Sequence, residues 1–222
     1  MRSKTLLLIC CLAVLTCVSE AQQGWRPLFD GKTLQGWKGY LRADAGVNWV
    51  VEEGVLACMG KGGDLITEEQ FDNFELSLEW KISKGDNSGI FYHVVEDAKY
   101  KTAYQTGPEY QLIDDVGFPE KLEPWQQSGA DYAMYPAGGN KKLKPAGEWN
   151  SSRIIFDRGH VEHWLNGEKV VEFEAWSEDW NRRKMASKWK DHPEYGMAKK
   201  GHIGLQDHES RVWFRNIRIR PL

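Results

Sequence analysis

The sequence has too few cysteines to be held together by disulfide bonds. It contains four cysteines in 222 residues, and Cys10, Cys11 and Cys17 all lie near the N-terminus. Only Cys58 remains beyond that segment, and a single cysteine cannot form an intramolecular disulfide. We therefore expect a fold stabilised by its hydrophobic core, with Cys58 as a buried thiol in a strand.

A long apolar run is also lacking outside the N-terminus. Arg2 and Lys4 precede an apolar stretch at 6–14, and a small-x-small motif follows at 19–21. This is the layout of a secretory signal peptide, and the stretch is too short for a membrane-spanning helix. We expect residues 1–21 to be removed on export to the periplasm or the medium.

The remaining residues, 22–222, show no linker and no internal repeat, which predicts one domain. Cys17 leaves open the alternative of a lipid anchor, although Thr16 before it is larger than the usual small residue.

A basic field is absent as well. The chain has 29 Lys and Arg against 32 Asp and Glu, a formal net charge of −3. Nucleic-acid binding needs a positive surface that attracts phosphates. We expect neither a nucleic-acid partner nor a transmembrane segment, and the composition does not indicate an oligomeric state.

Trp and Gly are present in excess, at 11 and 22 residues. Residues 74–82 alternate strictly, with Phe74, Leu76, Leu78, Trp80 and Ile82 on one face and polar residues on the other. This pattern is typical of a β-strand with one buried face.

Further short strands are separated by turn residues. We expect strands at 49–52, 55–58, 90–95, 109–113, 153–156, 161–165, 170–171, 202–206 and 212–219. Asn166-Gly167 predicts a type I′ hairpin. One helix is expected at 178–188, capped by Ser177. Many strands with one helical insertion predict an all-β sandwich or jelly roll of two antiparallel sheets.

Alternation also gathers polar side chains. Glu109 and Gln111 share a face opposite Tyr110 and Leu112, and Gln206 shares a face with His208 in the next-to-last strand. Such a face is either solvated or lines a sugar-binding hollow, and residue type alone leaves both interpretations open.

Seven motifs, in order, carry a resemblance to a known family. They are LFDGKTLQGW at 28–37, DNSGI at 86–90, EYQLID at 109–114, GEWN at 147–150, HWLNG at 163–167, GHIGLQDH at 201–208 and FRNIR at 214–218. Together they resemble the 3-keto-disaccharide hydrolase domain family, from about residue 25 to the C-terminus. The segment 175–195 reads as a variable insertion outside the motifs.

The resemblance implies a concanavalin A-like lectin/glucanase jelly roll and activity on glycosides oxidised at C3. A ketone at C3 acidifies the C2 proton, so a base near C2 and a charge stabiliser near the C3 oxygen are needed. Glu109 is the candidate base and His208 the candidate stabiliser or acid. A divalent metal held by some of Glu109, Gln206 and His208 is left open.

The other candidate residues would bind the sugar. They are Gln111, Gln206, Asn87, Ser88, His163, Trp149 and Glu79. Each has a plainer alternative: a turn for Asn87 and Ser88, and a core position for His163.

Two rival functions remain. An ordinary retaining glucanase needs two carboxylates on one strand face, and Gln111 is a neutral amide where the second acid would lie. A noncatalytic carbohydrate-binding module or lectin would use the same fold without turnover.

Overall fold

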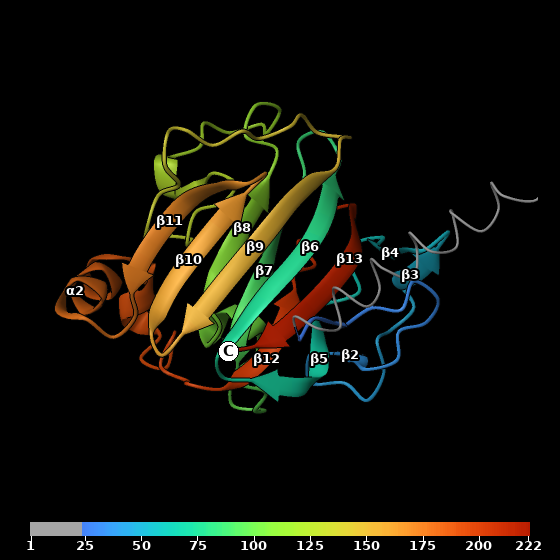
Figure 1. Ribbon diagram of the computed structural model, residues 1–222, viewed down its shortest axis with the longest axis horizontal. Helices are drawn as coiled ribbons and strands as arrows, with labels where there is room; N and C mark the ends of the chain where they lie inside the picture. Colours follow the sequence, from blue (N-terminus) through green and yellow to red (C-terminus); the bar gives the residue numbers. More distant parts are fainter. Residues whose placement is uncertain (1–23) are drawn as a thin grey trace, which may run out of the picture.

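The computed structural model describes residues 24–222, which form a two-layered β-sandwich (Figure 1). The predicted signal peptide at 1–21 and the lipid-anchor alternative at Cys17 lie outside the described residues. Within 24–222, no helix has both the length and the apolar character needed to cross a membrane.

The larger sheet has eight antiparallel strands, and most of them face the viewer in Figure 1. Its order is β11-β10-β9-β6-β13-β4-β3, with β1 paired to β13. The bounds are β1 (Arg26–Pro27), β3 (Trp49–Glu52), β4 (Val55–Cys58), β6 (Phe74–Ile82), β9 (Asn150–Asp157), β10 (His160–Leu165), β11 (Glu168–Glu174) and β13 (Val212–Pro221).

The smaller sheet has five antiparallel strands in the order β2-β5-β12-β7-β8 and lies behind the first. Its strands are β2 (Trp37–Gly39), β5 (Leu65–Phe71), β7 (Asn87–Val94), β8 (Glu109–Ile113) and β12 (Gly201–Leu205). The described helical segments are η1 (Ala103–Gln105), η2 (Pro124–Gln126), α2 (Glu178–Ala186) and η3 (Lys188–Asp191). The expected all-β sandwich with one helical insertion is confirmed.

Local sequence signals account for most element bounds. β3, β4, β6 and β8 begin and end where the sequence predicted. Asn166 and Gly167 both have positive φ, at 48° and 85°, as a type I′ turn requires. The strand β5 was missed because Glu68, Glu69 and Gln70 are three consecutive exposed residues that break the alternation.

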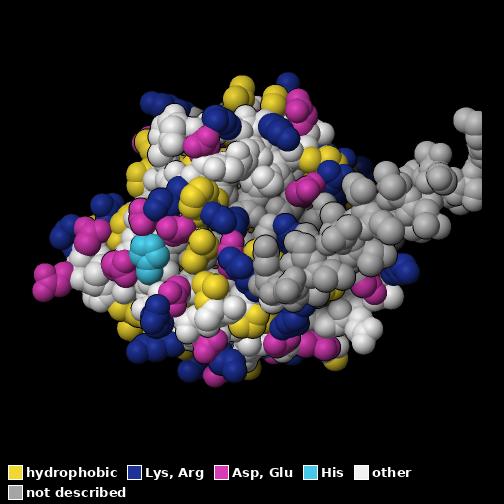
Figure 2. Space-filling model, in the orientation of Figure 1, with side chains coloured by type: hydrophobic (Ala, Val, Ile, Leu, Met, Phe, Trp, Pro, Cys, Tyr) yellow, Lys and Arg dark blue, Asp and Glu magenta, His cyan; other side chains and the backbone are white. Residues whose placement is uncertain are grey.

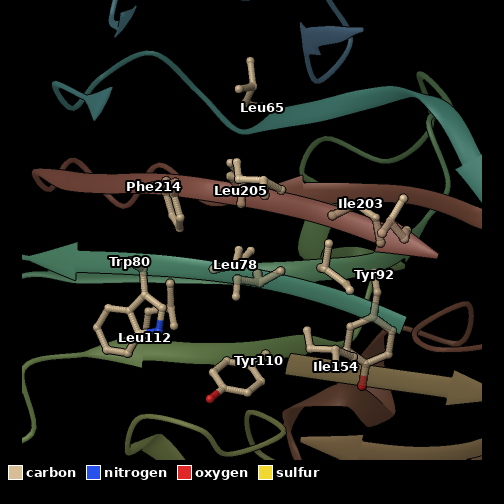
Figure 3. Packing of buried hydrophobic residues seen from close by; sticks show 14 of the residues in the cluster. Leu65, Leu78, Trp80, Tyr92, Tyr110, Leu112, Ile154, Ile203, Leu205 and Phe214 are labelled. Atoms are coloured by element: carbon tan, nitrogen blue, oxygen red, sulfur yellow. The ribbon is translucent and has the colours of Figure 1, made fainter. Parts of the chain in front are cut away.

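The core lies between the two sheets (Figure 3). The predicted apolar face of β6 is buried there, and Cys58 is a buried free thiol as expected. Three polar groups inside this core satisfy one another. The indole of Trp80 donates to the hydroxyl of Ser152 at 2.8 Å, and that hydroxyl donates to Tyr110, also at 2.8 Å. Each of these three buried polar groups therefore has a hydrogen-bond partner.

The outer face of the larger sheet carries interspersed acidic and basic side chains (Figure 2). Glu75, expected to face water, is only 3% exposed there. The guanidinium groups of Arg153 and Arg220 cover its carboxylate at 3.1 and 2.5 Å. Alternation placed Glu75 on the correct face but could not show that arginines would close over it.

The outer face of the smaller sheet is partly covered by a small apolar cluster, and the insertion adds a stack of aromatic rings to the main core cluster. A small cluster of Tyr40, Ile66, Phe91, Val94 and Ala103 covers one part of it. The insertion contributes a stack of Trp180, Tyr195 and Trp189, whose successive ring centroids are 6.5 and 4.0 Å apart.

The insertion is fastened to the chain beside β8. The indole of Trp189 donates to the carbonyl of Tyr132, whose own N–H donates to the carbonyl of Glu109. The predicted helix ends at Ala186, and the chain continues as the short helix η3.

Candidate active site

Glu109 is placed by the edge strand β8. Alternation turns Tyr110 and Leu112 into the core and leaves Glu109 and Gln111 on the outer face. The neighbouring strand β7 carries Gly89 directly beside them. A Cβ atom at Gly89 would lie 2.4 Å from Oε1 of Glu109, so the carboxylate lies over this glycine.

Burial dominates the environment of the Glu109 carboxyl group. The residue is 4% exposed, and no described residue hydrogen-bonds its carboxylate. Burial raises the pKa of Glu109 to about 8, with Lys188 acting against this shift and Asp64 adding to it. A carboxyl group that titrates near neutral pH can both accept and return a proton.

Unpartnered amide oxygens surround Gly89. Oε1 of Gln111, Oε1 of Gln206 and Oδ1 of Asn87 are buried without a hydrogen-bond partner. Gln111 is the register partner of Gly89, and the N–H of Gln206 donates to the carbonyl of Gly89 at 2.9 Å. Buried polar atoms normally have hydrogen-bond partners, so these three amide oxygens are available to accept hydrogen bonds from the hydroxyl groups of a ligand.

A hollow of about 270 Å³ opens beside these amides, between the loop before β5 and the loop after β12. Asp64, Tyr104, Gln206 and His208 are among its lining residues. Burial raises the pKa of Asp64 to about 6. His208 is exposed at the edge of this hollow, so the structure brings it near Gln206 and Asp64 without a direct contact to Glu109.

Lys188 belongs to the insertion that the sequence motifs did not cover. Its ammonium lies 4.3 Å from the ring centre of Tyr132, 4.4 Å from that of Trp189 and 5.7 Å from that of Tyr104. Partial burial lowers the pKa of Lys188, and the Glu109 carboxylate opposes this shift. Neither alternation nor a motif signalled this residue.

Asp131 is a second acid that sequence reasoning missed. It is fully buried, and both carboxylate oxygens lack hydrogen-bond partners. Burial, together with the charge of Glu109, raises the pKa of Asp131 well above its ordinary value. Asp131 follows an irregular loop, so no periodic pattern pointed to it.

Comparison with known proteins assigns this arrangement to a family. Residues 24–220 match the model of the 3-keto-alpha-glucoside-1,2-lyase-like domain. The chain belongs to this family. A 3-keto-disaccharide hydrolase of Bacteroides thetaiotaomicron is 40% identical over 230 residues, which cover 90% of this chain and 79% of that protein. The resemblance seen in the motifs is thus confirmed.

Solved structures agree with the family's fold. A candidate glycosyl hydrolase of Parabacteroides distasonis superposes with a TM-score of 0.88 at 44% identity, covering 92% of this chain and 96% of that one. A second candidate glycosyl hydrolase of that organism gives a TM-score of 0.70 at 31% identity, covering 89% and 99%. The jelly-roll sandwich is therefore the fold of these relatives too.

Two residues of the family motifs have structural roles instead of the predicted sugar contacts. Ser88 is fully buried, and its hydroxyl donates to the carbonyl of Gln206 at 2.9 Å. His163 is also fully buried, with Nδ1 at 3.1 Å from the carbonyl of Gly129 and Nε2 at 3.3 Å from the hydroxyl of Tyr92. Burial lowers the pKa of His163 to about 4, so the ring is a neutral core group.

Glu79 and Trp149 lie on the other side of the sandwich. Arg215 donates to Glu79 at 2.7 Å and lies over the ring of Trp149, 4.0 Å from its centre. Glu79 is on the outer face of β6, in the larger sheet, and therefore cannot contact a ligand bound over Glu109. The predicted sugar contacts of these two residues are replaced by an ion pair and a cation–π contact.

The donor set left open for a metal contains two ionisable ligands, Glu109 and His208, and the amide of Gln206. Among the described residues, three His, Cys, Asp or Glu ligand atoms come within 4.8 Å of one another only at His160, Glu162 and Glu172. That group lies on β10 and β11 of the larger sheet, where Lys169 pairs with both glutamates. Within residues 24–222, Glu109 and His208 belong to no such group of three.

Proposed function

We propose that the protein is an exported enzyme that cleaves glycosides oxidised at C3, with Glu109 as the base that removes the C2 proton. The observation that carries this proposal is a buried carboxyl group without hydrogen bonds, lying over a glycine and bordered by unpartnered amides. The family and its 3-keto-disaccharide hydrolase relative support the substrate class.

The chemistry follows from the ketone. Glu109 takes the proton from C2, and the electrons of the broken C–H bond form an enediolate with the C3 oxygen. The enediolate collapses to a C1=C2 double bond as the bond from C1 to its substituent oxygen breaks, and that oxygen takes up a proton. Water then adds across the double bond, with its hydroxyl on C1 and a proton returned to C2 by Glu109. The sum of these steps is hydrolysis.

The other polar groups have binding roles in this scheme. Gln111, Gln206 and Asn87 offer amides to the sugar hydroxyls, because their oxygens have no hydrogen-bond partner in the part of the chain that the structure describes. Asp64 and His208 line the adjoining hollow, where the C1 substituent would lie. His208 remains the candidate acid for the departing oxygen, since it is exposed and free to reach a ligand at the edge.

A direct assay tests the proposal. The purified protein is incubated with a 3-keto-glucoside and with the matching ordinary glucoside, and the released aglycone is measured. We expect release only from the 3-keto substrate, because only the ketone makes the C2 proton removable. Equal release from both, or release from neither, would contradict the proposal. A parallel incubation with EDTA tests the metal alternative.

The variant Glu109→Gln separates an enzyme from a lectin. The amide keeps the size of the side chain but cannot accept the C2 proton, so turnover should fall by about 10²- to 10⁴-fold. Binding of the 3-keto-glucoside, measured by calorimetry, should remain. A protein that binds the sugar and never turns it over, with or without the substitution, is the lectin.

A further inference from the structure

The ammonium group of Lys188 has no polar partner among residues 24–222. Three aromatic rings surround it, those of Tyr104, Tyr132 and Trp189. No described acid forms an ion pair with Lys188, and no described oxygen accepts a hydrogen bond from its ammonium. Cation–π contacts hold the charge in place but leave the N–H donors unused.

Lys188 also interacts electrostatically with the candidate base. Lys188 and Glu109 each influence the pKa of the other, yet they form no ion pair. The carboxylate is buried on the sheet, whereas Lys188 is an exposed residue of η3. The ammonium of Lys188 lies over the ring of Tyr132, whose backbone N–H donates to the carbonyl of Glu109, and over the ring of Tyr104, which lines the hollow beside Gln206. A ligand that enters this hollow would therefore lie near both the ammonium and the carboxylate.

We propose that Lys188 is a further catalytic residue, whose ammonium donates a hydrogen bond to the C3 carbonyl oxygen and stabilises the negative charge formed there when Glu109 removes the C2 proton. This inference rests on the proposed function. It assigns to Lys188 the charge stabilisation that the sequence predicts for His208.

The chemistry of the two side chains favours Lys188 for this role. His208 is exposed and lines the hollow on the side of Gln206. Lys188 is exposed as well, but three aromatic rings hold its ammonium in place, and a donor that is already positioned costs no reorganisation when charge develops. No bond to Lys188 forms or breaks: the proton stays on the amine, and the enediolate oxygen keeps its negative charge until C1 loses its substituent.

The variant Lys188→Met tests this role. Loss of one stabilising donor should lower kcat on the 3-keto-glucoside by about 10²- to 10³-fold. The KM should change by less than about fivefold, because the donor acts mainly on the charge that develops during the reaction. Lys188→Arg keeps the positive charge over the rings and should recover at least about tenfold of the lost rate.

Hydrogen exchange isolates the proton-transfer step. A 3-keto 1,5-anhydro sugar has no group to expel from C1, so exchange of its C2 proton in D₂O, followed by NMR, reports enediolate formation alone. Lys188→Met should slow this exchange as much as it slows turnover. Lys190→Met, an exposed lysine of the same helix η3, is the matched control and should exchange at the wild-type rate.

The outcomes distinguish the two proposals. A wild-type protein that neither cleaves 3-keto-glucosides nor exchanges the C2 proton would overturn both. An active wild type with Lys188→Met within fivefold of its exchange rate would overturn the role of Lys188 and leave that of Glu109 intact. The role of Lys188 would also be overturned if the rate of Lys188→Arg did not exceed that of Lys188→Met, since the positive charge would then not matter.

Discussion

Glu109 combines features that reduce stability and favour catalysis. Its carboxyl group is buried on the outer face of a strand and receives no hydrogen bond from a described residue. Such burial disfavours the charged form, because the protein interior solvates an anion poorly. The same burial raises the pKa of Glu109 into the range where a carboxyl group serves as a base and an acid.

The raised pKa of Glu109 predicts how stability depends on pH. Its ordinary value is 4.5, and its value in the folded protein is about 8. Between these values the folded chain holds a proton that the unfolded chain has released, so stability falls as the pH rises through this window. Each unit of pKa difference corresponds to about 1.4 kcal/mol. Glu109→Gln should therefore raise the Tm relative to wild type at pH 9.

At pH 4 both states of the wild-type protein bind this proton, and Glu109→Gln should leave the Tm almost unchanged. Thermal unfolding followed by circular dichroism at the two pH values checks the prediction. Equal Tm shifts at pH 4 and pH 9 would show that Glu109 titrates normally, and its role as a base tuned by burial would fail.

Single residues were predictable from the sequence only where a strand alternates. Glu109, Gln111 and Gln206 were found because period-2 alternation separates them from core residues. For His163 the sequence left a sugar contact and a core position open, because alternation tells which residues share a face and does not show whether a polar member of the core face is satisfied internally. The structure shows the core position. Lys188 and Asp131 lie outside regular strands, so no periodicity identified them.

At the scale of elements, the pairing of β7 with β8 builds the candidate site. Gly89 and Gln111 are register partners, and the absence of a side chain at Gly89 gives the Glu109 carboxylate its space. A close approach of this kind is a reason for glycine inside a strand. The glycine therefore belongs to the site although it carries no functional group.

Gly89→Ala should displace the carboxylate of Glu109. The new methyl group would lie 2.4 Å from Oε1 in the present arrangement, and the flexible glutamate side chain would have to move. Because a shift of about 1 Å in a catalytic group can cost up to about 100-fold in rate, we expect kcat to fall by about 10- to 100-fold. The Tm should change little, since the backbone of Gly89 is extended and remains paired.

Gly139→Ala is the control, because a Cβ atom there meets nothing within 4 Å. It should match the wild type in rate and in Tm. Full activity in Gly89→Ala would mean that the position of the Glu109 carboxylate over this glycine does not matter for the reaction.

Element bounds followed the sequence where propensity and burial agree. β6 was predicted to the residue because nine positions alternate without exception. β5 was missed since its exposed Glu68 to Gln70 segment resembles a loop, and pairing with β2 and β12 decides its conformation. Tertiary pairing can override local pattern in this way.

At the scale of the whole molecule, the two outer faces differ in how their polar groups are satisfied. On the larger sheet, acids such as Glu75 and Glu79 are paired with arginines. On the smaller sheet, Glu109 and the amides near it have unused hydrogen-bonding capacity. Sequence alternation identified polar residues on both faces, and only the structure shows which face has groups available for a ligand.

The insertion contributes residues near the candidate site at Glu109. The sequence motifs do not cover the insertion, yet its residues Lys188 and Trp189 lie against Tyr132. Tyr132 follows Asp131 in the chain, and its backbone N–H donates a hydrogen bond to the carbonyl of Glu109. The fold was predictable because many short strands with turn signals admit few architectures. The composition of the site was less predictable, because it joins a strand, two loops and an inserted helical turn that are far apart in the sequence.

The most direct test of the account is a crystal structure of Glu109→Gln with a bound 3-keto-glucoside. We expect the sugar on the outer face of the smaller sheet, with C2 within about 3 to 3.5 Å of the residue 109 side chain and the C3 oxygen near the ammonium of Lys188. A sugar bound instead on the larger sheet, beside Glu79 and Trp149, would contradict the account.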